Sequence, residues 1–513
     1  MPYEFSRYGL LALIALLAIP VYSYMQFRKR SAPEAAMYAL LLPWMFGPNL
    51  AAIDLPLAPA YGKTDFAFFG AALGLYLCAR RRLAVAKGGR FLEVLVVMLL
   101  IGDFMRFWAN RDNLWRGPTF QTGLSINDAI YYMLEDIPTV LLPLLIGRAC
   151  FQRRADAMSA LRLFVTFGLV YAPFILWEIR MSPQLHRQIY GYGMTYSFAQ
   201  SMRDGGFRPE VFLQHGLILG MFVMVVTFAA FGLWRIGRKQ VLRLPTPWVA
   251  IGLVALMVLV KAKGALVFTV VGAGTLYFLK PRTQMIVAAA MSLSVCIYAY
   301  LHMTGQFPAD ELMAQIEPFG EDRAQSMQFR LDNELTLAQR AGDRLWFGWG
   351  GYGRERVYDD EGHNMSTQDG AWIITLGIRG LFGFIAFFGA LILPVLYALV
   401  RIGKLKDERD QRIVTAFAMM TAFLTLNMLP NMAIAVLPFL CAGATVGLTS
   451  GLLAEQQRRR KERLQARRAA RRRASEESHR PPPPDDEPPP GGGEDYEDEE
   501  EPSIIINMPI NVR

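Results

Sequence analysis

The stretch WFGWGGYGR (residues 346–354) lies within the longest polar interruption of an otherwise apolar chain, the segment from about Leu301 to Gly380. The same segment contains FRLD (residues 329–332), GHN (residues 362–364) and QDGAW (residues 368–372), where a new apolar run begins. A polar connection of this length is usually either functional or disordered. Its aromatic and glycine content favours an ordered segment with a function.

Apolar runs of membrane-spanning length surround this segment on both sides. Of the 513 residues, 53% are hydrophobic and only 19% are charged, whereas a soluble domain carries more charge and fewer long apolar runs. We therefore predict an all-α, polytopic membrane protein with about 12–13 transmembrane helices. The predicted spans are residues 8–26, 35–52, 64–79, 91–108, 126–147, 160–177, 211–234, 246–260, 265–279, 284–302, 371–400, 413–428 and 432–452.

Lysine and arginine cluster in every second connection between these runs, which predicts that the basic side faces the cytoplasm. The connections 109–125, 178–210 and 303–370 then lie outside. The sequence thus divides into an N-terminal transmembrane bundle (1–302), one large periplasmic loop (303–370), C-terminal transmembrane helices (371–454) and a cytoplasmic tail (455–513). The tail is basic, then Pro-rich and acidic, and we expect it to be disordered.

The net charge of +9 raises the possibility of a nucleic-acid partner. Much of it lies in the basic run 458–473, directly after the last apolar run, where cytoplasmic anchoring charge belongs. We therefore expect a membrane and no nucleic acid. No two histidines share a metal-ligand spacing, and the four cysteines are scattered, so we expect no metal site.

The informative cations are those that this topology puts outside or at the outer rim of the membrane. Outer loops often carry basic residues that are simply solvated, and this applies to any single arginine in the large loop. Lys261 and Lys263, however, lie between two apolar runs with almost no loop, where ionisable groups are costly and usually functional. Converging cations suit a pyrophosphate group, because arginine forks chelate phosphate oxygens. The other candidate cations are Arg203, Arg208, Arg330, Arg354 and, just inside the following span, Arg379.

Three further residues are candidates for proton transfer or structural capping. His215 begins an apolar run, where a structural, hydrogen-bonded histidine is the simpler interpretation. His363 lies among acidic residues and is either an exposed histidine or a general base. Asp369 is either a base that orients a hydroxyl group or the N-cap of the next helix.

Taken in order, these motifs resemble the O-antigen ligase and polymerase superfamily of bacterial envelope glycan enzymes. The resemblance covers roughly residues 165–400. It rests on GGFRPEVFLQH (205–215), Lys263-Gly264, Arg330, the turn GWGGYG (348–353) and GIRG (377–380) within a span.

The resemblance implies a metal-independent glycosyltransferase of the inner membrane that needs no cofactor. It would transfer a glycan from undecaprenyl pyrophosphate to an acceptor glycan or lipid on the periplasmic face, with Arg208, Lys263 and Arg330 holding the pyrophosphate. Ligases carry His-Asn about eleven residues before the closing glycine motif, but Ser366-Thr367 occupy that place and His363-Asn364 come earlier. Asp369-Gly370 is similar to the acidic variant of capsule and exopolysaccharide polymerases, which favours a polymerase. A chain-length regulator or another protein that binds the tail is a possible partner.

Other functions remain open at this point. A ligase that transfers glycan to lipid A core is the nearest alternative. A glycolipid transporter or flippase would place charge near the middle of the bilayer on broken helices in paired halves. A scaffold would act through its charged tail.

Overall fold

The computed structural model describes residues 9–79, 90–193, 201–203, 205–432 and 436–478, and the chain divides into two units, 1–457 and 458–513. The described residues are mostly helical. Each apolar run predicted from the sequence coincides with a helix or a pair of joined helices. The apolar helices are α1 (Leu10–Lys29), α2 (Ala32–Phe46), α3 (Lys63–Leu77), α4 (Arg90–Trp108), α5 (Ile126–Asp136), α6 (Leu142–Cys150), α7 (Arg154–Met181), α9 (Gly216–Ile236), α10 (Thr246–Leu259), α11 (Lys263–Phe278), α12 (Pro281–Met303), α15 (Ala371–Ile402), α16 (Glu408–Asn427) and α17 (Leu437–Ser478).

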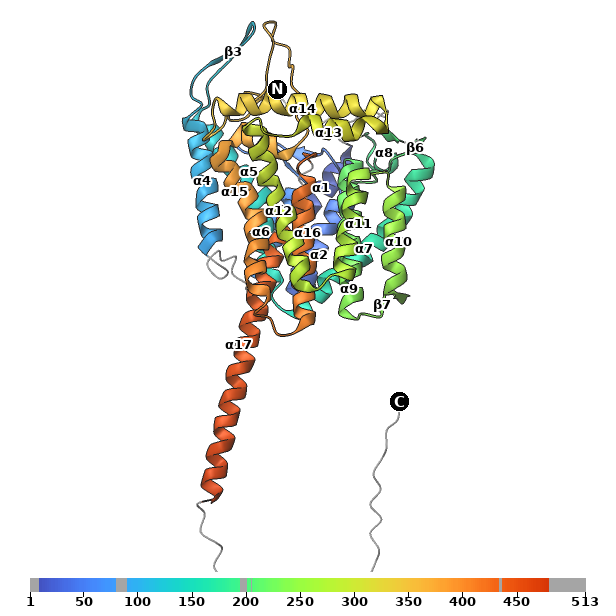
Figure 1. Cartoon of the computed structure of the whole chain (residues 1–513), viewed down its shortest axis with the longest axis vertical. Helices are drawn as coiled ribbons and strands as arrows, with labels where there is room; N and C mark the ends of the chain where they lie inside the picture. Colours follow the sequence, from blue (N-terminus) through green and yellow to red (C-terminus); the bar gives the residue numbers. More distant parts are fainter. Residues whose placement is uncertain (1–8, 80–89, 194–200, 204, 433–435, 479–513) are drawn as a thin grey trace, which may run out of the picture. The chain divides into compact units, whose positions relative to one another are not determined.

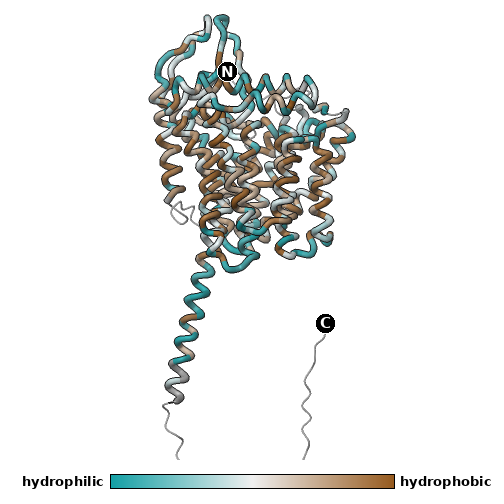
Figure 2. Tube along the Cα trace, in the orientation of Figure 1, coloured by the Kyte–Doolittle hydropathy of each residue, from teal (hydrophilic) through white to brown (hydrophobic). Residues whose placement is uncertain are grey.

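Seven helical segments of the described chain are long and apolar enough to cross a membrane, so a membrane protein is the class that the fold supports. These seven are Leu10–Lys29, Ile126–Cys150, Arg154–Met181, Gly216–Ile236, Pro281–Met303, Ala371–Ile402 and Leu437–Arg471. Two shorter apolar helices, α10 and α11, accompany them. Apolar residues dominate the middle of the bundle and polar residues its two ends (Figure 2).

Apart from η2 (Ile137–Leu141), which lies within the span Ile126–Cys150, the remaining elements join or flank the long helices. α8 (Leu185–Tyr190), α13 (Ala309–Ile316), η4 (Glu317–Phe319) and α14 (Glu321–Gly342) are short or amphipathic helices, and η2 is a π-helical turn that joins α5 to α6. The strands form four antiparallel two-stranded hairpins: β1 (Ala52–Ile53) with β2 (Tyr61–Gly62), β3 (Leu114–Arg116) with β4 (Thr119–Gln121), β5 (Met202–Arg203) with β6 (Gly206–Phe207), and β7 (Gln240–Val241) with β8 (Leu244–Pro245). α13 and α14 lie across one end of the bundle, at which α8, β3 and β6 also lie, whereas β7 lies at the other end (Figure 1).

The core of the bundle is built around α9 and α16, most of whose residues are buried. α9 packs against α7, α10, α11 and α16, so one apolar helix is surrounded by others on every side. α17 packs on α6 through Gly443 and Gly447 and on Gln152, just after α6, through Gly451. A Cβ at Gly443 would lie only 2.0 Å from a backbone carbonyl oxygen of α6. This spacing of small residues is the one that lets membrane helices approach closely.

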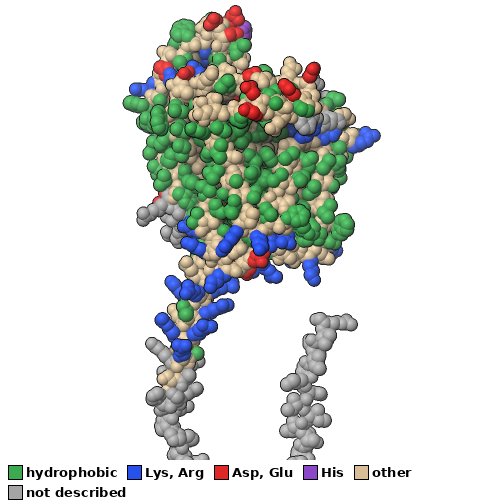
Figure 3. Space-filling model, in the orientation of Figure 1, with side chains coloured by type: hydrophobic (Ala, Val, Ile, Leu, Met, Phe, Trp, Pro, Cys, Tyr) green, Lys and Arg blue, Asp and Glu red, His purple; other side chains and the backbone are tan. Residues whose placement is uncertain are grey.

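The charges of the first unit are unevenly distributed. In Figure 3 acidic side chains are prominent at the end of the bundle that carries α13 and α14, and lysine and arginine side chains gather at the opposite end. This arrangement agrees with the alternation of basic connections along the sequence.

The polar segment 303–370 and the basic stretch after residue 454 contain more helix than a loop and a disordered tail would. The large loop includes α13 and α14. α17 continues through Ser478, so residues 455–478 are helical in the structure, where the sequence suggests a disordered tail. The reason is composition: residues 455–478 consist largely of arginine, alanine, glutamate and glutamine, which are strong helix formers. The Pro-rich and acidic part lies outside the described residues.

Candidate functional site

Two of the predicted site residues meet at the mouth of a cavity of about 220 Å³. Arg330, on α14, and Asp369, two residues before α15, form an ion pair with 3.5 Å between Nε and Oδ2. Both side chains remain nearly half exposed, so they can still receive a ligand. α12 and the segment after α16 complete the walls through Tyr298 and Leu429.

A buried polar cluster forms the inner wall of this cavity. The Tyr298 hydroxyl donates a hydrogen bond of 2.6 Å to Oε2 of Glu334, and Nε2 of His302 lies 3.4 Å from the same oxygen. Glu334 lines the cavity next to Arg330, although its residue is only 9% exposed. The sequence analysis named no partner for His302. The spacing of residues in the sequence could have indicated the cluster. Tyr298 and His302 are four residues apart on one helix, and Arg330 and Glu334 are four residues apart on another, so each pair shares a helix face.

A second polar centre lies at the connection between α10 and α11. The Nζ of Lys261 donates a hydrogen bond of 2.9 Å to the backbone carbonyl oxygen of Arg203 in β5, which ties Lys261 to the β5–β6 hairpin. Lys263 is the exposed first residue of α11. A Cβ added at Gly206 would lie 2.5 Å from Nζ of Lys261, so the β5–β6 hairpin holds its glycine against this amine.

Arg208 and His215 follow the same hairpin. Arg208 is 4% exposed, and its Nε has no hydrogen-bond partner among the described residues. Burial lowers the pKa of Arg208 to about 10, so the side chain stays cationic at neutral pH. His215 is the N-cap of α9, with Nδ1 accepting a hydrogen bond from the Leu217 amide, and burial lowers its pKa to about 4. His215 is therefore a neutral capping residue, the simpler of its two interpretations.

The loop that carries Arg208 is fixed by buried polar side chains from other helices. Glu178, near the end of α7, accepts hydrogen bonds from the amides of Glu210 and Val211 at 2.9 and 2.7 Å. The carbonyl oxygen of Phe212 accepts from Lys63 and from Asn49, both at 2.8 Å. This framework was not predicted, because nothing in the local sequence relates residues so far apart in the chain.

The glycine turn docks onto α15 and not onto an open surface. The amides of Trp349 and Gly350 donate to the carbonyl oxygens of Gly377 and Ile378 at 2.8 and 3.0 Å. α15 is interrupted at Gly380, whose φ of 64° is non-helical. The glycines of the turn therefore allow close approach of backbone to backbone.

Arg354 is a structural residue in this arrangement. Its guanidinium is buried and donates to the carbonyl oxygens of Trp349, Thr122 and Asp112 at 3.1, 3.3 and 3.0 Å. All three of its nitrogens are thus used within the protein. It ties the glycine turn to the connection that contains β3 and β4, and it lies apart from the cavity residues.

Arg379 is likewise held by protein groups. It forms a bidentate pair with Asp136, both distances being 2.6 Å, and lies 3.6 Å from Asp103. Arg106 joins this cluster, with Nη2 at 3.7 Å from Asp103 and its guanidinium 3.1 Å from the centre of the Tyr132 ring. The break in α15 directs Arg379 into a charged cluster between α4, α5 and α15.

His363 lies in an exposed turn. Its side chain is 75% exposed, with Nδ1 at 3.2 Å from Asp359 and 3.7 Å from Glu361. These three side chains could hold a metal ion by distance alone, but exposed acidic groups are common without one. Among the described residues, His363 forms no hydrogen bond or ion pair with Arg330 or Asp369.

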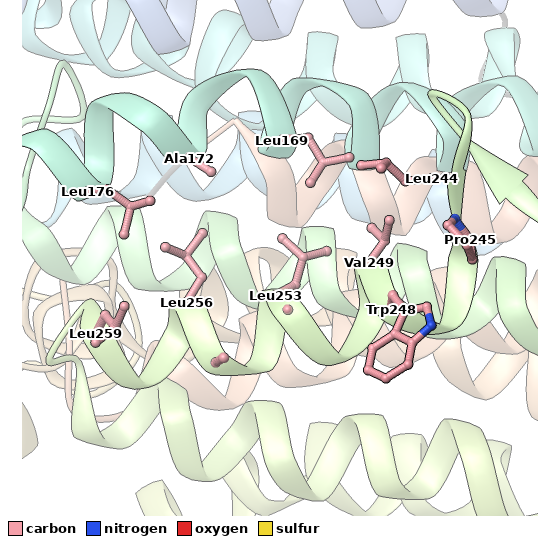
Figure 4. A pocket seen from close by; sticks show the side chains of 12 residues that line it. Leu169, Ala172, Leu176, Leu244, Pro245, Trp248, Val249, Leu253, Leu256 and Leu259 are labelled. Carbon is pink, nitrogen blue, oxygen red and sulfur yellow. The ribbon is translucent and has the colours of Figure 1, made fainter.

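An apolar groove of about 480 Å³ runs between α7 and α10 (Figure 4). Leu169, Ala172 and Leu176 of α7 face Val249, Leu253 and Leu256 of α10 across it (Figure 4). One end of the groove reaches Leu259, two residues before Lys261.

Comparison with known proteins leaves the chain without an assigned family. No protein-family model matches it, and no similar sequence was found among curated proteins.

Proposed function

We propose that this protein is a polysaccharide polymerase that lengthens a glycan carried on undecaprenyl pyrophosphate at the outer face of the inner membrane. The observation that carries the proposal is the pairing of Arg330 with Asp369 at the mouth of a polar cavity, at the end of the bundle away from the basic connections. A cation beside a carboxylate is what a transfer from pyrophosphate needs. The cation neutralises charge that develops on the leaving group, and the carboxylate orients the acceptor hydroxyl.

The second polar centre supports the same proposal. We call Arg203, Arg208 and Lys261, which lie in or beside the β5–β6 hairpin, the cationic patch; the apolar groove ends at Leu259, two residues before Lys261. An anionic lipid would place its phosphates on these cations and its chain between α7 and α10. We leave Arg354 and Arg379 out of the phosphate site, because protein groups already hold both guanidinium groups.

The chemistry rests on positioning and on charge. Arg330 would stabilise the departing pyrophosphate, and Asp369 would hold the acceptor hydroxyl in line with the sugar carbon that is attacked. Transfer of the whole chain to lipid A core, as in a ligase, would use the same groups with another acceptor.

The test is reconstitution of the purified protein in liposomes with undecaprenyl-pyrophosphate-linked oligosaccharide, with glycan length read on a gel. The wild type should produce a ladder of longer lipid-linked glycans, and Arg330→Ala should abolish it. Arg356→Ala is the matched control, because this loop arginine is about as exposed as Arg330, at 44% against 47%. An unchanged ladder from Arg330→Ala would refute the proposal, and transfer only to lipid A core would indicate a ligase.

One observation favours a glycolipid transporter as the second candidate. The cluster of Asp103, Arg106, Asp136 and Arg379 lies on helices of the bundle, where α15 is interrupted and η2 interrupts the α5–α6 helix. Buried charge on broken helices is typical of transport pathways. Movement of a fluorescent glycolipid between leaflets without formation of a glycosidic bond would support this candidate over the polymerase.

A further inference from the structure

The cavity beside Arg330 contains a carboxylate that the proposed function does not yet use. Glu334 is one helical turn from Arg330, lines the cavity and is 9% exposed. A buried carboxylate is costly unless hydrogen bonds or a proton compensate for its lost hydration. The side chains around Glu334 therefore indicate whether it can accept a proton.

The hydrogen bonds of His302 constrain where a proton can be. Nδ1 of His302 lies 3.1 Å from the carbonyl oxygen of Tyr298, and a carbonyl only accepts, so Nδ1 carries the hydrogen. In the neutral ring Nε2 is then an acceptor, and it faces Oε2 of Glu334 at 3.4 Å. Two acceptors face each other, and one proton between them would satisfy both.

Tyr298 completes this arrangement from the same helix as His302. Its hydroxyl donates to Oε2 of Glu334 at 2.6 Å, which stabilises the ionised carboxylate. The aromatic rings of Phe307 and Trp372 pack on Tyr298 and His302 with centroid distances of 4.0 to 5.4 Å, which excludes water from the inner side. The outer side of Glu334 faces the cavity that holds Arg330 and Asp369.

From this geometry we infer that Glu334 accepts the proton of the acceptor hydroxyl in the cavity. His302, on the far side of the carboxylate, can then take this proton from Glu334. The inference rests on the proposed function and adds a residue to it. Asp369, paired with Arg330 at the mouth, then orients the hydroxyl, and Glu334 removes its proton. His363, in its exposed turn, has no part in this step.

One bond forms, one bond breaks and one proton moves in the transfer. The acceptor oxygen forms a bond to the sugar carbon, and the bond from that carbon to the pyrophosphate oxygen breaks, with its electron pair leaving on the pyrophosphate. The hydroxyl proton passes to Glu334, which can then donate it to Nε2 of His302. Return of this proton through Glu334 to the cavity, and from there to solvent, restores the site.

The charges around Glu334 set the pH range of the step. Burial raises the pKa of Glu334, the charge of Asp369 also raises it, and Tyr298 and Arg330 lower it. His302 also contacts the carboxylate, with Nε2 3.4 Å from Oε2. The rate should therefore rise with pH through a pKa above the ordinary glutamate range and then level off.

The test compares the pH dependence of glycan extension in liposomes for the wild type, Glu334→Gln, Tyr298→Phe and Glu355→Gln. Glu334→Gln should lose about 10²–10⁴-fold in rate together with the acid limb of the profile, while binding of the lipid-linked substrate persists. Tyr298→Phe should keep activity but move the acid limb to higher pH, because the carboxylate loses a donor. Glu355→Gln, a buried carboxylate outside the cavity, should keep the wild-type profile.

A second readout needs no enzymatic activity. The infrared carboxyl band that is present in the wild type and absent in Glu334→Gln should disappear as the pH rises through the pKa of Glu334. A wild-type pH profile in Glu334→Gln, or a band that does not titrate, would overturn the assignment. Absence of extension by the wild type, with a band that still titrates, would instead refute the proposed function and keep the proton site.

Discussion

Gly348 and Gly380 touch backbone to backbone, although one lies in the polar loop and the other within an apolar helix. A Cβ on Gly348 would lie 2.5 Å from the Gly380 amide nitrogen, and a Cβ on Gly380 would lie 2.4 Å from the Gly348 amide nitrogen. Both residues also have positive φ, of 68° and 64°. This contact joins the large loop to α15 and fixes where Arg379 leaves the helix.

Replacing either glycine by alanine should therefore destabilise the protein. The left-handed backbone conformation costs about 1–2 kcal/mol for a residue with a Cβ, and overlap with backbone atoms adds about 1–3 kcal/mol. Gly348→Ala and Gly380→Ala should both lower the thermal unfolding temperature in detergent. Gly342→Ala is the control, since a Cβ there meets nothing within 4 Å, and it should unfold as the wild type does. Equal stability of all four proteins would show that the two glycines do not meet.

Replacing Arg354 by alanine should lower the free energy of unfolding more than replacing Arg330 does. Arg354→Ala removes the donor of the buried Trp349 carbonyl oxygen and of the carbonyl oxygens of the exposed residues Thr122 and Asp112, so we expect a loss of about 1–3 kcal/mol in the free energy of unfolding. Arg330→Ala removes only a half-exposed ion pair, which contributes about 0–1 kcal/mol. Denaturant unfolding in detergent measures both changes. A stable Arg354→Ala protein that fails only in ligand binding would assign Arg354 to the phosphate site.

Asp136 and Arg379 should be strongly coupled. Removing one partner leaves a buried charge unpaired, at a cost of about 3–5 kcal/mol, whereas removing both avoids that cost. Asp136→Ala and Arg379→Ala should each destabilise the protein more than the double variant does. The coupling energy of the double-mutant cycle, from unfolding temperatures, is the measurement. Additive effects would mean that the two side chains do not form the pair.

The loop that carries Arg208 should weaken as pH rises. Burial, with a contribution from the Glu178 charge, raises the pKa of Glu210 to about 7 from its ordinary value of 4.5. A carboxyl whose pKa is raised on folding contributes stability below its unfolded pKa and loses it as pH rises through the folded value. Between about pH 5 and about pH 8 the wild type should lose up to about 3 kcal/mol relative to Glu210→Gln. Thermal unfolding of both proteins across this range tests the sign, and a constant difference would contradict it.

The apolar helices followed from the sequence, because each depends on a local run of hydrophobic residues. The roles of the arginines did not follow, because Arg330 and Arg354 occupy similar polar surroundings in the sequence. Only the fold shows that one lines a cavity and the other is buried between loops. The contact between Gly348 and Gly380 could not be predicted either. Both glycine motifs are visible in the sequence, but no local pattern relates one to the other. The four-residue spacing of Tyr298 with His302 and of Arg330 with Glu334 is a pattern in the sequence that could have indicated the buried polar cluster.

The central claim is that the cavity of Arg330 and the cationic patch of Arg203 share the outer face of the membrane. The most direct measurement is labelling of single cysteines by a membrane-impermeant maleimide in oriented membrane vesicles, in a background without the four native cysteines. Arg330→Cys and Arg203→Cys should react in right-side-out vesicles, and Lys404→Cys, between α15 and α16, only in inside-out vesicles. Labelling of positions 330 and 203 on the cytoplasmic side, or on opposite sides, would contradict the account.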